Sequence, residues 1–303
     1  MQAQDYAGAK WAIGIRLPGS TDADIEAAFA RGAILRTHVL RPTWHFVTPA
    51  DIRWLLALTA PRIHAANARM YRTLGLDAAT FRRSDAALAK ALEGGHHLTR
   101  DELRAVFARR GIATNDERMA YLVMHAELDG LVCSGPRRGK QFTYALLEER
   151  ARPARTLARD EALAELARRF FVSRWPATVQ DLAKWAGLTV ADARMGFEAA
   201  RPPVKDKVGT QRSPVAHLLS VFDEYISSYR EGSAIIGAGY KLRRSGTGES
   251  GLYVVAIDGA VVGTWRRTIA AQASVTLFRR VSPAERRALD RAVKRYAAFA
   301  DRH

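Results

Sequence analysis

A helix–turn–helix pattern followed by a basic hairpin is the feature that most constrains how this chain can fold. The run Leu98–Glu102 predicts a capping box that begins one helix, and that helix ends near Gly111. A second predicted helix covers 116–128 and leads into two short apolar stretches around a Gly/Pro-rich tip. The tip carries three cations: Arg137, Arg138 and Lys140. This order predicts a winged-helix unit whose exposed tip contacts DNA phosphates.

The segment before this unit combines a helix with a β-hairpin. A short helix is predicted over 21–31, and two strands over 34–40 and 43–47 are joined by a tight turn at Arg41-Pro42. Thr48-Pro49 then begins a helix, which we expect to end before Pro61 because proline disrupts a helix interior. We interpret 1–92 as a first winged-helix unit and 93–150 as the second.

The segment after the second unit repeats the helix–turn–helix spacing. A helix over about 160–172 precedes two shorter helices capped by Thr178 and Thr189, with Gly187 in the turn between them. We interpret 151–200 as a third helix-turn-helix unit and the following basic, proline-containing stretch 201–214 as a linker.

The remainder, 215–303, has the pattern of a β-rich domain with a terminal helix. Apolar and polar residues alternate between Gly-rich turns at 237–239 and 245–251, and Asp258-Gly259 predicts a hairpin. Ser282-Pro283 predicts the start of a C-terminal helix. The fold class is therefore α+β: tandem winged-helix units followed by a small antiparallel β-barrel-like domain, or a curved sheet, and a terminal helix.

The charge of the chain indicates a nucleic-acid partner. The formal net charge is +16 and the pI is about 10.5, which is the electrostatic signature of a nucleic-acid binder. A high-GC genome also favours arginine, but it would add matching acidic residues, which are absent here. We expect double-stranded DNA as the partner.

The cellular location is predicted from cysteine usage and the lack of targeting signals. Cys133 is the single cysteine, so no intramolecular disulfide can form and a reducing compartment is favoured. No apolar run reaches the roughly 18 residues of a membrane span, and the N-terminus lacks the features of a signal peptide. We expect a cytoplasmic, nucleoid-associated protein with no membrane partner.

Common cofactor and metal motifs are absent from the sequence. There is no phosphate-binding loop, no HExxH and no GxSxG, and the eight histidines do not fall at metal-ligand spacings. The adjacent pair His96-His97 fits a loop better than a metal site. We expect no cofactor and no metal.

Four stretches, in order, match a known family. They are Gln2–Asp5, Arg36–Pro61, Trp175–Leu188 and His217–Arg266. The chain resembles the winged-helix DNA glycosylases of the AlkZ/YcaQ type, in which a Gln-x-Gln motif is catalytic. It departs from them in two respects: the motif begins one residue after Met1, where family members have a preceding helix, and the segment 201–214 is short.

The resemblance implies DNA repair by hydrolysis of the N-glycosidic bond of cationic N7-alkylated purines, including bulky adducts and crosslinks. Gln2 and Gln4 would be the catalytic pair. A cationic base leaves without protonation, so glutamine suffices to orient water and face a positive sugar, although it cannot serve as a general base. Residues i and i+2 lie about 200° apart on a helix, so we expect the pair in extended backbone or at a helix start. The alternative is simply a polar N-terminus.

Other candidate residues each have a structural alternative. His45 could support the active site, lie in the core or contact DNA. Asp223 could position the site or its water, or form an ion pair with a nearby arginine. Trp265 is a barrel-core residue or a base-stacking platform. Arg41 and Arg266 are further candidate DNA contacts. No lysine has the setting of a Schiff-base nucleophile, which predicts a monofunctional glycosylase without lyase activity.

Two classes of function remain open from the sequence. One is a monofunctional DNA glycosylase that acts as a monomer. The other is a non-enzymatic winged-helix DNA-binding protein, either a dimeric transcription regulator or a damage binder. Three dissimilar units and a β domain in one chain favour the monomer that clamps DNA.

Overall fold

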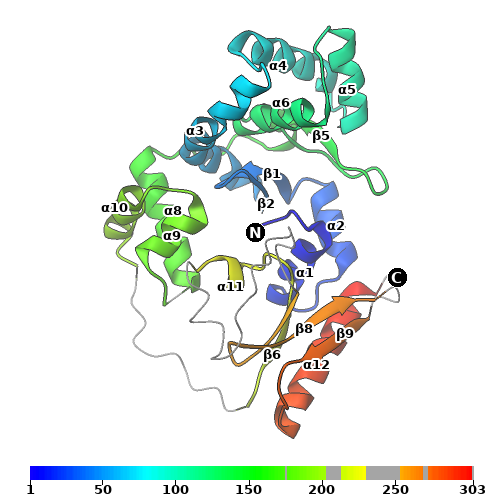
Figure 1. Cartoon of the computed structure of the whole chain (residues 1–303), viewed down its shortest axis with the longest axis vertical. Coiled ribbons are helices and arrows are strands. Elements are labelled where there is room, and N and C mark those ends of the chain that lie inside the picture. Colours follow the sequence, from blue (N-terminus) through cyan, green and yellow to red (C-terminus); the bar gives the residue numbers. More distant parts are fainter. Residues whose placement is uncertain (175, 203–212, 230–252, 269–271, 302–303) are drawn as a thin grey trace. The chain divides into compact units, whose positions relative to one another are not determined.

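The computed structural model describes residues 1–174, 176–202, 213–229, 253–268 and 272–301 (Figure 1). The chain is a mixed α/β protein that separates into two compact units. Unit 1 consists of Met1–Ala27, Arg174–Ala177 and Pro203–His303, and unit 2 of Ala28–Ser173 and Thr178–Pro202. Both ends of the chain therefore belong to the same unit, and the five-segment organisation stays a prediction.

Unit 1 combines an N-terminal helix with a C-terminal sheet and helix. Its elements are α1 (Tyr6–Arg16), the start of α2 (Asp22–Ala30), β6 (Ala216–Leu219), α11 (Glu224–Ser227), β7 (Val254–Ile257), β8 (Ala260–Arg267), β9 (Ala273–Leu277) and α12 (Pro283–Ala300). The four strands form an antiparallel sheet in the order β6-β7-β8-β9.

The sheet of unit 1 is open, so the predicted barrel-like closure is wrong for the described strands. β6 and β9 form its two edges, and α12 contacts both of them. The other side of the sheet also packs against apolar residues, which include Ile15 of α1 and Tyr225 and Ile226 of α11. Helices thus bury the apolar residues of the sheet without its curling onto itself. The alternative prediction, a sheet that does not close, describes these strands better.

The hairpin between β7 and β8 confirms the prediction from Asp258-Gly259. Asp258 has φ 48° and Gly259 has φ 84°, the left-handed pair that a two-residue hairpin turn needs. The turns predicted at 237–239 and 245–251, and the linker residues 203–212, lie outside the described residues.

The helix α1 is anchored in the core of unit 1 by Trp11. This side chain is 2% exposed, its Nε1 donates to the carbonyl of Leu218 at 2.6 Å, and its ring lies 5.1 Å from those of Tyr296 and Phe299. Gly14 lets the helix approach closely, because a Cβ there would lie 2.5 Å from the Phe299 ring. The residues just before α1 are thereby fixed beside the sheet.

Unit 2 is mostly helical, with two small sheets. Its elements are β1 (Leu35–Val39), β2 (Thr43–Val47), α3 (Pro49–Thr73), α4 (Ala78–Leu92), β3 (Leu98–Thr99), α5 (Arg100–Arg109), α6 (Asp116–Leu128), β4 (Val132–Ser134), β5 (Thr143–Leu146), α7 (Leu147–Arg150), α8 (Arg159–Arg174, whose last residue falls in unit 1), α9 (Val179–Ala186) and α10 (Val190–Ala200). The strands pair as β1-β2 and as β3-β5-β4.

Several helix boundaries in both units follow their predicted caps. Thr99, Thr178 and Ser282 each form a capping box with the acidic residue three positions later. Gly187 ends α9 with φ 69°, and a Cβ there would lie 2.3 Å from the carbonyl oxygen of Leu40. The α9–α10 turn thus packs directly on the β1–β2 turn, and only glycine fits between them.

The predicted end of a helix before Pro61 is wrong, because α3 continues through this residue to Thr73. Proline removes one backbone hydrogen bond, but Ala60 and Ile63 on either side of it pack into an apolar cluster with Leu128. Burial of this face stabilises the helix enough to carry it past the proline.

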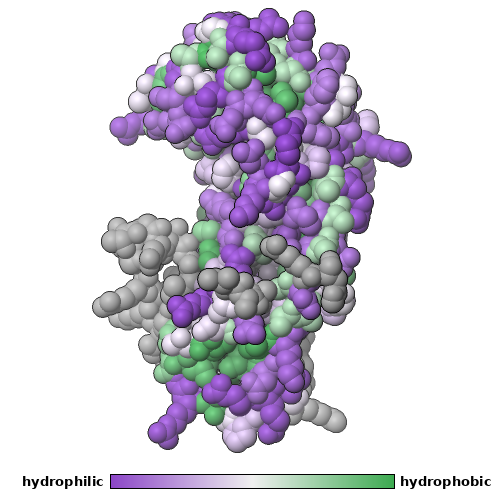
Figure 2. Space-filling view, turned by 90° about the vertical axis from the view of Figure 1, so that its right-hand side faces the viewer, coloured by the Kyte–Doolittle hydropathy of each residue, from purple (hydrophilic) through white to green (hydrophobic). Residues whose placement is uncertain are grey.

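One part of the core of unit 2 lies between α4, α5 and α6. Fully buried side chains from these helices are Leu88, Leu92, Leu103, Phe107, Met119 and Leu122. Outside this core, hydrophilic residues cover most of the upper part of the face seen in Figure 2, which belongs to unit 2. None of the helices described is long and apolar enough to cross a membrane.

Candidate functional site

The two N-terminal glutamines lie side by side in non-helical backbone immediately before α1. Gln2 is 7% exposed, whereas Gln4 is exposed. The Nε2 of Gln2 donates a hydrogen bond to the Oε1 of Gln4, so the two side chains share one side of the segment. Asp5 then caps α1 in an extended conformation. The predicted backbone setting of the pair is confirmed.

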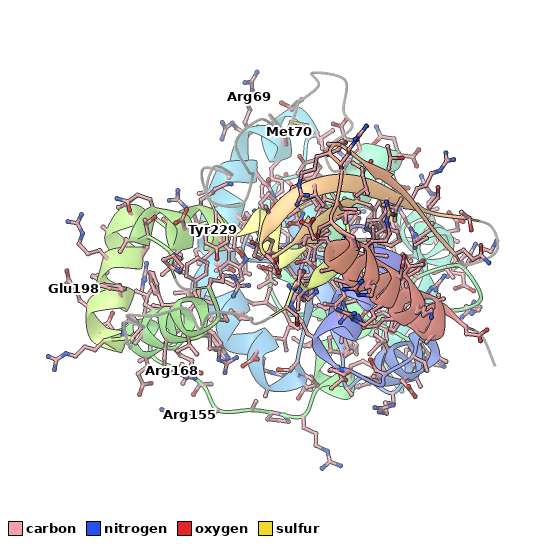
Figure 3. All side chains as sticks on the ribbon, turned by 90° about the horizontal axis from the view of Figure 1, so that it is seen from below. Arg69, Met70, Arg155, Arg168, Glu198 and Tyr229 are labelled. Carbon is pink, nitrogen blue, oxygen red and sulfur yellow. The ribbon has the colours of Figure 1, made fainter. Side chains whose placement is uncertain are left out.

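The backbone of Gln2 is held by a buried ion pair. Its N–H donates to the Oε1 of Glu224 at 3.1 Å, and the other carboxylate oxygen accepts from Arg174 at 2.8 Å. The Nε of Arg174 donates to the Oγ of Ser228 at 2.6 Å. The backbone carbonyl of Arg174 accepts from the hydroxyl of Tyr229 at 3.0 Å, and Tyr229 is labelled in Figure 3. Because both oxygens of Glu224 are engaged, this carboxylate positions the glutamine segment.

Asp223 forms a separate ion pair next to it in sequence. The carboxylate is 1% exposed and accepts from both terminal nitrogens of Arg16, at 2.8 and 2.9 Å. One of its oxygens also accepts from the backbone N–H of Tyr225 at 2.8 Å, which caps α11. The ion-pair alternative for Asp223 is thus confirmed, and a direct role with water or substrate stays a prediction.

Asp5 ties the glutamine segment to the C-terminal sheet. Its carboxylate accepts a hydrogen bond from the hydroxyl of Tyr253 and lies 3.5 Å from Arg267. Burial, and then the hydrogen bond to Asp5, raise the pKa of the Tyr253 hydroxyl, so it remains a proton donor. Gly8 leaves room for this arrangement, because a Cβ there would lie 2.4 Å from Asp5 Oδ2.

The comparisons with known proteins bear on what this site does. The family model described as "DNA glycosylase AlkZ-like" matches residues 1–299. The chain belongs to this family of DNA glycosylases. The family places the protein among DNA-repair enzymes, and it confirms the resemblance drawn from the sequence motifs.

The fold agrees with this assignment. The structure is similar to that of Streptomyces sahachiroi DNA glycosylase AlkZ, with a TM-score of 0.79 and 21% sequence identity over 99% of this chain and 88% of that chain. A comparison with curated proteins gave no match. At this identity the solved structure supports the fold alone.

Sequence reasoning on this AlkZ-like chain found the glutamine pair but missed the groups that hold it. Glu224 lies in a stretch that the resemblance singled out, next to the predicted Asp223, but its partner Arg174 is distant in sequence. The carboxyl of Asp5 and the hydroxyl of Tyr253 gave no motif of their own. The only sequence signal around Tyr253 was the alternation of apolar and polar residues, which predicts a strand but does not show which distant side chain it contacts.

His45 lies in unit 2, on β2, and is fully buried. Its Nδ1 is 2.9 Å from the carbonyl oxygen of Thr43. This setting is that of a core histidine, which was one of the alternatives, and support of the active site stays a prediction.

The tip of the β4–β5 hairpin presents its three cations differently. Arg138 is folded back, with NH1 2.6 Å from Glu102 and NH2 2.8 Å from the carbonyl oxygen of His97. Lys140 is exposed. Arg137 is half-buried, with its guanidinium 5.4 Å from the centre of the Phe142 ring. Lys140 is therefore the tip cation most open to a phosphate.

A buried arginine next to this hairpin is held between two aromatic rings and was not predicted. The guanidinium of Arg36 lies 4.3 Å from the centre of the Phe142 ring and 4.2 Å from that of Trp44. Cation–π contacts of this kind fix the direction of a guanidinium. They connect the β1–β2 strands to the hairpin that carries Lys140.

The two remaining candidate DNA contacts lie in different units. Arg41 is half-buried in unit 2 and packs against Gly187: a Cβ added to this glycine would lie 3.3 Å from the Cγ of Arg41. Arg266 is exposed on β8 of unit 1, opposite Ser274. A DNA-binding role for either is a prediction.

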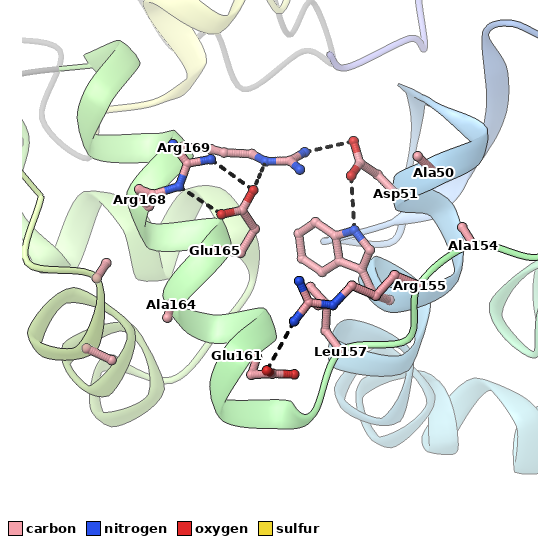
Figure 4. Close-up of a pocket in the computed structure, with 13 residues that line it drawn as sticks. Ala50, Asp51, Ala154, Arg155, Leu157, Glu161, Ala164, Glu165, Arg168 and Arg169 are labelled. Atoms are coloured by element: carbon pink, nitrogen blue, oxygen red, sulfur yellow. Dashed lines mark hydrogen bonds and ion pairs between the residues drawn. The ribbon is translucent and has the colours of Figure 1, made fainter.

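A cleft of about 610 Å³ between α3, α8 and α10 of unit 2 is also lined with arginines (Figure 4). Each is already paired: Arg155 with Glu161 at 3.2 Å, Arg168 with Glu165 at 2.8 Å, and Arg169 with Asp51 at 2.8 Å. Hydrogen bonds from Arg168 lower the pKa of Glu165 to about 2. A phosphate would have to displace these carboxylates, so the cleft is a poor anion site.

Proposed function

We propose that this enzyme hydrolyses the N-glycosidic bond of cationic N7-alkylated purines in double-stranded DNA, with Gln2 and Gln4 as the catalytic residues. The observation that carries the proposal is the contact between the two side-chain amides, with Gln2 anchored through its backbone by the Glu224–Arg174 pair. An anchored and an exposed amide form a polar site with fixed dipoles, which is what stabilisation of a developing charge requires.

The proposed reaction needs a water and a leaving base, and no proton donor. The bond between the sugar C1′ and purine N9 breaks, and its electron pair neutralises the cationic alkylpurine. The water oxygen bonds to C1′ and loses a proton to solvent. The Oε1 of Gln4 accepts from Gln2 and retains a second lone pair, which can accept a hydrogen bond from this water.

The carboxylates near the pair do not serve as the general acid or base. Both oxygens of Glu224 and both oxygens of Asp223 accept hydrogen bonds from backbone or arginine donors. Amides do not exchange protons near neutral pH, so the site favours a base that is already positively charged. Crosslinked and bulky N7 adducts fall in the same class of leaving group.

For DNA binding, we propose that residues 93–150 form a winged-helix unit in which α5 and α6 pack on the β3-β5-β4 sheet. Lys140 and Arg137 at the hairpin tip would contact phosphates, while Arg138 would do so only by leaving Glu102. We propose that Arg41 and Arg266 also contact DNA phosphates. The five-segment organisation, a monomeric state and a cytoplasmic, nucleoid-associated location belong to this proposal.

The experiment is base release from a duplex that contains one N7-methylguanine. We expect wild type to leave abasic sites, and Gln4→Ala to slow release by about 10²–10³-fold, the usual cost of one positioned dipole. The matched control is Gln272→Ala, an exposed glutamine of the same unit. Duplex affinity should be equal in all three.

Two results would overturn the proposal. One is release by Gln4→Ala at the wild-type rate. The other is tight, salt-sensitive duplex binding without release by the wild type, which would favour the alternative of a damage-binding protein.

A further inference from the structure

Imidazole and carboxylate side chains cluster where α3, α4 and α6 of unit 2 meet. His64 lies on α3, Asp85 on α4 and His125 on α6, and Asp129 is the C-cap of α6. One ligand atom from each of His64, His125 and Asp129 lies within 4.8 Å of the other two. The helix α6 contacts both α3 and α4, and the three are seen together in the upper part of Figure 1.

The distances within this cluster approach those of a metal site. The Nε2 of His64 is 3.0 Å from Asp129 Oδ1, and the Nδ1 of His125 is 3.4 Å from Asp129 Oδ2. Asp85 Oδ2 lies 4.0 Å from the same Nδ1. Neighbouring ligand atoms around a tetrahedral zinc ion are about 3.3 Å apart, given Zn–N and Zn–O bonds of about 2.0–2.2 Å. Small side-chain rotations would therefore suffice.

The neighbouring side chains orient the two imidazoles. The Nδ1 of His64 is 3.0 Å from the hydroxyl of Tyr71. If the proton of the imidazole is on Nδ1 and is donated to this hydroxyl, Nε2 carries the lone pair and faces the cluster. The ring of Phe81 stacks on that of His125 at 3.6 Å with an angle of 13°. Asp85 Oδ1 is buried without a hydrogen-bond partner among the residues that the structure describes.

We propose that His64, His125, Asp129 and Asp85 form a binding site for a divalent transition-metal ion of the zinc class, which fastens α3, α4 and α6 to one another. Two imidazoles and two carboxylates are a donor set that suits zinc. The site belongs to unit 2 and the glutamine pair to unit 1, and the proposed glycosylase reaction does not use the site. Sequence spacing missed it because the four residues come from three helices.

The test is zinc binding by the full chain after treatment with EDTA, measured by calorimetry and by thermal unfolding. We expect one saturable Zn²⁺ site. At a free zinc concentration 100 times Kd, Tm should rise by about 5–10 °C. Asp129→Asn, which keeps side-chain hydrogen-bonding capacity, should bind zinc about 100-fold more weakly or worse. Mutation of a residue that only hydrogen-bonds to a metal ligand already lowers metal affinity by roughly 10–100-fold, and loss of a ligand should cost at least as much.

Two further variants separate this site from binding by surface histidines and from misfolding. His96→Ala removes an exposed loop histidine and should leave zinc affinity and the rise in Tm unchanged. His64→Gln should weaken binding as Asp129→Asn does, while its circular dichroism spectrum matches wild type. Equal zinc affinity in wild type and Asp129→Asn, or loss of binding in His96→Ala alone, would overturn the proposal. So would a Tm that does not respond to zinc.

Discussion

The glutamine pair of unit 1 and the histidine cluster of unit 2 differ in what they can hold. Gln2 and Gln4 do not titrate, and the carboxylates beside them are engaged by arginines or backbone donors. The histidine cluster brings together titratable groups that can share a cation. What a polar cluster can bind thus depends on which of its charges are already paired, and five predictions test this difference.

The largest effect should come from the charge of the lesion. Because the glutamine pair supplies no proton, a neutral lesion such as ethenoadenine should be released at least about 10²-fold more slowly than N7-methylguanine, the usual contribution of a general acid. Single-turnover release from matched duplexes measures this ratio. Comparable rates for the two lesions would mean that a proton donor acts in the site. The glutamine pair would then not differ from the histidine cluster in lacking titratable groups.

The second effect concerns the ion pair behind the glutamines. Glu224→Gln leaves Arg174 buried without its charged partner, because the two side chains are only 8% and 16% exposed. We expect the free energy of unfolding to fall by about 3 kcal/mol, together with slower base release. Urea denaturation measures the first change.

A double variant, Glu224→Gln with Arg174→Met, is the control for that prediction. It removes both charges and should recover part of the stability while base release stays slow. Recovery of both properties would show that the ion pair does not position Gln2.

A smaller effect is expected at the hairpin tip. Lys140→Ala should weaken duplex binding several-fold and lower the salt dependence of log K by about 1, as the loss of one phosphate contact does. The control is Arg287→Ala, which removes an exposed charge from α12. Binding titrations between 50 and 200 mM salt compare the two variants with wild type. If the slope of log K against log salt concentration is the same for Lys140→Ala and wild type, Lys140 does not contact DNA.

The smallest effect is the response to pH. Burial, and then the nearby Arg295, lower the pKa of His217 below 6.5. A histidine with a lowered folded pKa favours the unfolded chain when it is protonated, so unit 1 should lose stability as pH falls below 6.5. Thermal unfolding between pH 8 and pH 5 tests this, and His217→Gln should flatten the profile.

Catalysis should respond differently from stability. Base release by the glutamine pair should change less than about twofold between pH 6 and pH 8, because neither amide titrates. A bell-shaped rate profile in this range would show that an ionisable group takes part.

The sequence predicted the local features of the fold well, because their causes lie within a few residues. The capping boxes at Thr99, Thr178 and Ser282 and the Asp258-Gly259 turn are examples. The helices α1 and α4 were not predicted, and α3 was cut short at Pro61, because burial against distant segments decides them.

The candidate site was predicted only in part, for the same reason. The Gln-x-Gln motif was visible in the sequence, and its spacing gave the correct backbone conformation. Its supports are 222 residues away at Glu224 and 248 residues away at Tyr253, and no periodicity reports such pairs. The histidine cluster was missed because, of its four residues, only His125 and Asp129 are spaced as neighbours on one helix face.

The attachment of Asp5 to Tyr253 has a consequence for the timing of activity. During synthesis the glutamines leave the ribosome first, whereas the tyrosine, the strands of the sheet and the helix α12 leave last. The segment that carries the proposed chemistry therefore stays without its anchors until nearly the whole chain has been made. A nascent or C-terminally truncated chain should already fold the helices of unit 2, yet be unable to release a base from DNA.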